Sequence, residues 1–93
     1  MSKRIRWLNI ALNDLDESIE YLAQRNINAA HKLADRLWNS VQLLVNNPKM
    51  GRPGRISGTR ELVIGGTSYI IPYRIKDNEI QILRVLHGAS TSA

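Results

Sequence analysis

The 93-residue sequence contains no cysteine and only two histidines, and its longest apolar runs extend over a few residues. Without cysteine the chain can form neither disulfides nor thiolate metal sites, and His31 and His87 cannot complete a four-ligand zinc site alone. The short runs exclude a transmembrane helix, which needs about 20 apolar residues, and the start MSKRIRW lacks the apolar core of a signal peptide. We therefore expect a cytoplasmic protein with no membrane contact, metal or cofactor.

The composition is that of one small folded domain spanning residues 1–93. Hydrophobic residues make up 43% of the chain and charged residues 23%, a balance typical of folded rather than disordered chains. A domain of this length buries about 60 to 65% of the surface of its unfolded chain. A partner that covers further surface would therefore add to its stability.

Basic residues outnumber acidic residues by 13 to 8, which gives a net charge of +5, and the two signs are unevenly distributed. Basic side chains open the chain and crowd the segment that leads into the last strands. This distribution predicts an anionic partner for the carboxyl-terminal half, either nucleic acid or an acidic protein segment. Five of the eight acids lie in the intervening helical part: Asp14, Asp16, Glu17, Glu20 and Asp35.

The first half of the chain reads as a strand followed by two helices. Residues 3–7 alternate apolar and basic side chains, as a short edge strand does. Apolar residues then recur at intervals of three and four residues, from Asn9 to about Gln24 and again from Ile27 to Val45, which predicts two helices. Asn26 is the predicted N-cap of the second helix. The two apolar seams should pack into an antiparallel hairpin; they are Leu12, Leu15, Ile19 and Leu22, and Ala30, Leu33, Leu37, Val41 and Leu44.

After Pro48 the spacing at which apolar residues repeat changes from 3.6 residues, typical of a helix, to 2 residues, typical of a strand. Residues 49–58 are rich in glycine and proline and indicate a surface loop. Three strands follow, at 59–64, 69–75 and 79–87. The last strand has apolar side chains on both of its faces, which favours a central position in the sheet. We predict an α+β two-layer fold: a short amino-terminal strand and a helical hairpin packed on one face of an antiparallel sheet with a carboxyl-terminal three-stranded meander.

The arginines of the last third are the candidate site residues. Arg60, Arg74 and Arg84 each lie in a different predicted strand, so neighbouring strands could bring them together into one cationic patch. Arg52 and Arg55, in the GRPGR loop, could join them and grip carboxylate or phosphate groups with planar guanidiniums. The alternative for Arg74 and Arg84 is ion pairing with strand or helix carboxylates.

The order of elements, together with the segments GRPGRISGTREL, PYRI and ILRVLHGA, resembles the RelE/ParE superfamily of bacterial toxins over nearly the whole chain. The resemblance implies a toxin of a type II toxin-antitoxin module that is neutralised by a cognate acidic antitoxin, through which it would reach operator DNA. RelE-like members cut messenger RNA on the ribosome, whereas ParE-like members inhibit DNA gyrase. Because the fold is shared, the residues of the site must decide between the two branches.

Two positions favour the ParE-like branch and inhibition by binding rather than by catalysis. In RelE-like enzymes a key arginine follows the aromatic residue that opens the third strand, and here Tyr69 is followed by Ile70. RelE-like enzymes also carry basic or aromatic catalytic groups at the carboxyl end, whereas this chain ends HGASTSA. Ser90 departs from the HGAR of related ParE-like sequences as well.

Two alternatives remain open. A metal-independent endoribonuclease would have to use His87, Arg60 and Arg84, with Glu61 as a possible base, although strict alternation places Glu61 and Arg60 on opposite faces of a strand. His87 could instead end a strand and make only local contacts. A degenerate, non-toxic member that still binds an antitoxin is the other alternative, and Ser90 gives it support.

Overall fold

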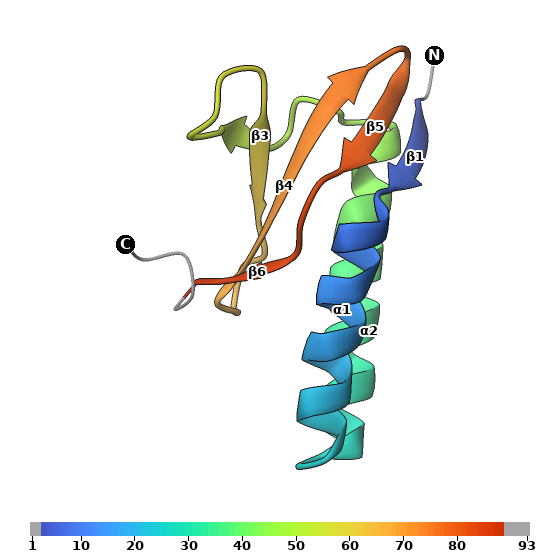
Figure 1. The fold of residues 1–93 in the computed structure, drawn as a ribbon, viewed down its shortest axis with the longest axis vertical. Helices are drawn as coiled ribbons and strands as arrows, with labels where there is room; N and C mark the ends of the chain where they lie inside the picture. Colours follow the sequence, from blue (N-terminus) through green and yellow to red (C-terminus); the bar gives the residue numbers. More distant parts are fainter. Residues whose placement is uncertain (1–2, 89–93) are drawn as a thin grey trace.

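A short strand and a helical hairpin form the first half of the chain in the computed structural model, which describes residues 3–88 (Figure 1). Strand β1 spans Arg4–Trp7, helix α1 spans Asn9–Ala23 and helix α2 spans Ile27–Gln42. The Asn26 side chain accepts a hydrogen bond of 3.0 Å from the backbone N–H of Ala29. This bond satisfies one of the free donors at the start of α2 and confirms the predicted N-cap.

The second half forms a meander, as predicted, and β1 joins the same sheet. The strand order is β1-β5-β4-β3-β2, with antiparallel pairing from β2 to β5 and parallel pairing between β1 and β5. Strand β6 pairs with the start of β4. The strands are β2 Arg52–Pro53, β3 Arg60–Val63, β4 Tyr69–Lys76, β5 Glu79–Ile82 and β6 Leu86–His87.

The turn between β4 and β5 has the backbone geometry that a two-residue hairpin needs. Asp77 and Asn78 adopt positive φ angles of 53° and 62°. Aspartate and asparagine tolerate this left-handed conformation better than most residues, and its twist matches that of the flanking strands. The local sequence therefore sets the register in which β5 returns along β4.

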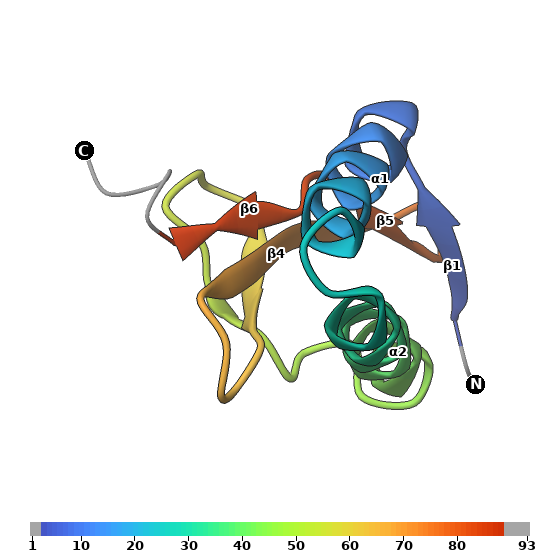
Figure 2. The same cartoon turned by 90° about the horizontal axis from the view of Figure 1, so that it is seen from below.

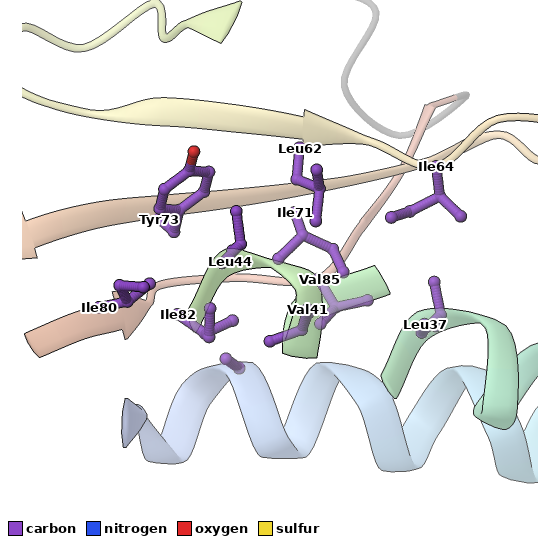
Figure 3. Packing of buried hydrophobic residues seen from close by; sticks show 11 residues of the cluster. Leu37, Val41, Leu44, Leu62, Ile64, Ile71, Tyr73, Ile80, Ile82 and Val85 are labelled. Atoms are coloured by element: carbon purple, nitrogen blue, oxygen red, sulfur yellow. The ribbon is translucent and has the colours of Figure 1, made fainter. Parts of the chain in front are cut away.

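The core lies between the helical hairpin and one face of the sheet. Leu37, Val41 and Leu44 of the second helical segment are fully buried against Ile71 and Tyr73 of β4 (Figure 3). Ile71 and Tyr73 are two residues apart on their strand and therefore point to the same face of the sheet, as do their core neighbours on the adjoining strands. Only one face of the sheet is therefore covered by helices; the other strand residues of the covered face in the core are Leu62, Ile80 and Ile82.

Three boundaries differ from the sequence prediction. Helix α2 ends at Gln42 and a single 3-10 turn, Leu43–Val45, completes the predicted segment. The predicted loop at 49–58 contains the short edge strand β2, which pairs with β3. The predicted strand at 79–87 is broken, because residues 83–85 leave the ladder before β6 begins.

The helical hairpin extends beyond one end of the sheet. Figures 1 and 2 show the paired helices running side by side past the end of the sheet at which β4 begins and β6 ends. The tip of the hairpin, where α1 ends and α2 begins, therefore extends beyond the strands. Among residues 3–88, no helix is long and apolar enough to cross a membrane.

Candidate binding face of the sheet

The face of the sheet turned away from the helices, which we call the open face, is organised in rows across the strands. Arg4, Glu79 and Lys76 form one row, and Arg6, Gln81 and Arg74 form the next. Further along β4 the rows become apolar, with Ile70 opposite both Val63 and Leu86. The open face therefore has a charged half near the β4–β5 turn and an apolar half near β6.

Two hydrogen bonds and one ion pair connect the charged half across three strands. Arg74 Nε donates to Gln81 Oε1 at 2.6 Å, and Gln81 Nε2 donates to Glu79 Oε1 at 2.8 Å. Arg6 Nη1 lies 3.6 Å from the same carboxylate oxygen. The hydrogen bond from Gln81, together with the positive charge of Arg6, holds the pKa of Glu79 below its ordinary value.

This arrangement leaves the charged half with a positive excess. Arg4, Arg74 and Lys76 have no carboxylate within ion-pair distance in the described part of the chain, whereas Arg6 is paired with Glu79. Fixed positive charges on a rigid sheet attract anionic partners and steer their approach. The sequence prediction of an anionic partner thus has a specific surface in the structure.

Arg52 is on the open face as well, but it is paired internally. Its Nη2 atom lies 3.0 Å from Glu61 Oε1, and the backbone N–H of Arg55 donates to Glu61 Oε2 at 3.3 Å. Burial by itself raises the pKa of Glu61, but these hydrogen bonds outweigh burial and hold the pKa below its ordinary value. Glu61 is therefore a poor general base and a buried partner of Arg52, rather than a solvated strand residue.

The apolar half contains a groove of about 340 Å³ around Ile70. Pro72, Leu83 and Leu86 line the groove beside Ile70, and Ile56 contributes a side chain that is 73% exposed. Ile70 occupies the position at which the resemblance places a catalytic arginine in RelE-like enzymes. An apolar groove at this position can bind an apolar side chain, and Ile70 itself offers no cation to stabilise a scissile phosphate. The arginines in the groove wall are Arg55 and Arg84, and Arg84 is paired with Asp14.

The predicted convergence of Arg60, Arg74 and Arg84 on one patch is wrong. Arg60 is the register partner of Tyr73 and so belongs to the helix-facing side, where its Nη1 atom donates to the carbonyl oxygens of Gly51 at 2.7 Å and Lys49 at 3.2 Å. Arg74 lies on the open face.

Arg84 pairs with a helix carboxylate, which is the alternative that the sequence left open for it. Its Nε atom lies 2.7 Å from Asp14 Oδ2. Alternation along a strand separates Arg60 from Arg74, and α1 binds Arg84, so the three guanidiniums do not form one site.

His87 lies far along β4 from Arg60. It is the register partner of Tyr69, four residues from the partner of Arg60, a span of about 13 Å along a strand. Its ring contacts the Tyr69 ring edge-on, with centroids 5.1 Å apart. The structure therefore does not bring His87, Arg60 and Arg84 together as an acid-base set. Ser90 lies outside the described residues.

The sequence prediction missed three residues of the open face: Arg4, Arg6 and Lys76. The alternation in residues 3–7 places Arg4 and Arg6 on one face of their strand, and this signal was available. What the alternation could not indicate is that β1 pairs with β5, far along the chain, and so carries both arginines to the same face as Arg74.

A helical hairpin packed on one face of a mixed sheet is the fold of the small RelE/ParE-like toxins. Residues 5–91 match the family described as the ParE toxin of the type II toxin-antitoxin system parDE. The chain belongs to this family.

Individual relatives carry both names of the superfamily. The Sinorhizobium fredii protein Y4kP, named as a toxin, is 46% identical over 92% of this chain and 88% of its own length. Toxin RelE2 of Caulobacter vibrioides is 33% identical over 92% of this chain and 96% of its own. A chain of the chromosomal ParDE system from P. aeruginosa superposes with a TM-score of 0.83 and 29% identity, covering 92% of this chain and 96% of its own.

Proposed function

We propose that this toxin acts in the ParE-like manner: it inhibits DNA gyrase by binding, uses the open face as its contact surface, and is neutralised by an acidic antitoxin. The observation that carries the proposal is the state of the groups that a nuclease would need. Arg84 is bound to Asp14, Arg60 is bound to loop carbonyls and Ile70 lies in an apolar groove. Inhibition by binding needs only a rigid surface of complementary shape and charge.

The antitoxin partner is supported by the ParDE toxin-antitoxin system to which this fold is similar. An acidic antitoxin segment fits the open face, where Arg4, Arg74 and Lys76 carry unpaired positive charge. The adjoining apolar groove would take apolar side chains from the same segment. Antitoxin and gyrase would then compete for one surface, which explains neutralisation without any change in the fold.

A supercoiling assay with purified gyrase and a cleavage assay with translating ribosomes test the proposal. Gyrase should be inhibited and transcripts should remain intact. The variant Arg74→Gln should need about three- to tenfold more protein for the same inhibition, since removal of one contact charge costs roughly 1 kcal/mol. Lys32→Gln is the matched control, because Lys32 is an exposed helix residue that loses the same charge.

Three results would overturn the proposal or its contact surface. Specific transcript cuts with unaffected supercoiling would assign the chain to the RelE-like branch. Normal growth of cells that express the chain without an antitoxin, combined with no effect on gyrase, would identify a non-toxic member. Equal loss of inhibition in Arg74→Gln and Lys32→Gln would remove the open face as the contact surface, since net charge alone would then explain the effect.

A further inference from the structure

A second cavity, of about 620 Å³, lies on the helix-facing side, between the helical hairpin and the strands β4 and β6. Helix α1 contributes Glu17, Tyr21 and Leu22, and α2 contributes Leu33. Tyr69 of β4 and His87 of β6 form the opposite wall. The cavity therefore has walls from four elements and is separate from the open face, because Tyr69 has the parity of the core residues Ile71 and Tyr73.

The walls present three aromatic rings above an apolar floor. The Tyr69 and His87 rings meet at 86°, with centroids 5.1 Å apart, so they form a corner. Tyr21 supplies a third ring, which is 61% exposed, and Leu22 and Leu33 are half-buried beneath. Rings at an angle to one another surround a small group from several sides, which is the arrangement by which aromatic cages bind cations.

The polar groups of the cavity have no partners within residues 3–88. The Glu17 carboxylate, the Tyr21 and Tyr69 hydroxyls and the His87 ring nitrogens make no hydrogen bond or ion pair in this part of the chain. A carboxylate beside aromatic rings, without an internal counter-ion, favours a positively charged ligand. One of the three rings already has an internal cation, because the guanidinium of Arg25 lies 4.6 Å from the centroid of the Tyr21 ring.

The acidic side chains of α1 also favour a cation over nucleic acid, although Arg25 adds one positive charge beside Tyr21. Asp16, Glu17 and Glu20 of α1 have no ion pair in the described chain, and only Asp14 is neutralised, by Arg84. A nucleobase could stack on the rings, but its phosphates would approach these carboxylates and be repelled. A basic polypeptide would be attracted by the same charges.

We propose that this cavity binds a lysine or arginine side chain of a partner polypeptide, with Glu17 as the counter-ion and the rings of Tyr21, Tyr69 and His87 as walls. The site does not depend on the proposed gyrase contact, because it lies on the other side of the sheet and has the opposite polarity. Acidic partners would thus bind the open face of the toxin, and a basic segment of a partner would bind this cavity.

Titration of the full-length protein with acetyl-Gly-Arg-Gly-amide, followed by NMR, tests the assignment. The ring signals of Tyr21, Tyr69 and His87 should shift saturably at millimolar peptide. Glu17→Gln should weaken binding about three- to fivefold, as expected for loss of an exposed ion pair. Glu20→Gln is the matched control on the same helix, outside the cavity wall, and should change binding less than about twofold.

Four outcomes would overturn the assignment. The first is the absence of saturable shifts. The second is equal weakening by Glu17→Gln and Glu20→Gln, which would indicate diffuse attraction to α1. The third is stronger binding of acetyl-Gly-Glu-Gly-amide or guanosine monophosphate at the same rings. The fourth is a concentration-dependent dimer in sedimentation that Glu17→Gln abolishes, since a second copy would then be the occupant. A second variant, Tyr21→Leu, at an exposed position, should weaken binding about two- to fivefold with the fold intact.

Discussion

Asp14 of α1 binds both the side chain of Arg84 and the backbone beside it, across 70 residues of sequence. Asp14 Oδ2 accepts hydrogen bonds from Arg84 Nε at 2.7 Å and from the backbone N–H of Val85 at 3.0 Å. Asp14 Oδ1 accepts a third from Arg84 Nη2 at 3.1 Å. One carboxylate thus holds Arg84 and the backbone of Val85 to the helical layer at the interruption between β5 and β6.

We expect Asp14→Asn to destabilise the fold. The substitution removes a bidentate ion pair and weakens the bond to Val85, but Arg84 is 43% exposed on its side chain and can be solvated. After allowance for that solvation, the loss in the free energy of unfolding should be about 1 to 2 kcal/mol. Urea unfolding at pH 7 measures this loss. Asp16→Asn, an exposed neighbour on the same helix, should change the free energy by less than about 0.5 kcal/mol.

The Asp14 contribution should disappear in acid. Burial alone raises the pKa of Asp14, but the hydrogen bonds from Arg84 and Val85 outweigh it and lower the pKa below the ordinary value of 3.8. A carboxyl group with a lowered pKa in the folded state stabilises the fold above the ordinary value, and the stabilisation is lost as the pH falls through the folded value. The difference in unfolding free energy between wild type and Asp14→Asn should therefore be constant above about pH 5 and shrink below pH 3.8. A difference that does not change with pH would contradict this linkage.

Gly51→Ala should be strongly destabilising because Gly51 packs directly against Tyr73. A methyl group at Gly51 would lie 2.6 Å from Tyr73 Cε1 and 2.9 Å from the carbonyl oxygen of Glu61. Relief of this overlap would displace a buried ring, at a cost of about 1 to 3 kcal/mol. Gly65→Ala provides the comparison, since its added methyl group would come no closer than 3.7 Å to the flexible side chain of Arg36. Similar stability of the two variants would show that Tyr73 can move without cost.

Tyr73→Phe should also destabilise the fold, for a different reason. The Tyr73 hydroxyl accepts a hydrogen bond from the Gly51 N–H at 2.8 Å and donates one to the Pro48 carbonyl at 2.7 Å. Removal of the oxygen leaves a buried backbone N–H without its partner, which costs about 1 to 3 kcal/mol. Tyr21→Phe, at an exposed position, should be nearly neutral in the same thermal or urea unfolding measurement. A loss for Tyr73→Phe as small as that for Tyr21→Phe would indicate that the backbone of residues 48–51 finds other hydrogen-bond partners.

Much of the fold could be predicted because its signals are local. The 3.6-residue period of the helices and the positive-φ turn at Asp77 and Asn78 depend on residues close together in sequence. The cap at Asn26 depends on a contact three residues away. By contrast, the interruption of the last predicted strand coincides with a contact to Asp14, some 70 residues away. No local pattern could have indicated that break.

The candidate site was predicted less well than the fold. The sequence prediction included Arg74, which lies on the open face, but it grouped Arg60 and Arg84 with it and omitted Arg4 and Arg6. Alternation along a strand gives the face of a residue only relative to its strand neighbours. The side of the whole sheet to which that face belongs is set by strand pairing and by the position of the helices.

The sequence alone therefore determined the elements, their order, the positive charge and the family, because each of these is carried by composition, short-range periodicity or local motifs. Tertiary structure alone decided which cations remain available to a partner. Parallel pairing of β1 with β5 brings Arg4 and Arg6 beside Arg74, and the carboxylates of Asp14 and Glu61 bind Arg84 and Arg52. Charge is a property of the residue, whereas its availability depends on what the folded chain places within about 4 Å of it.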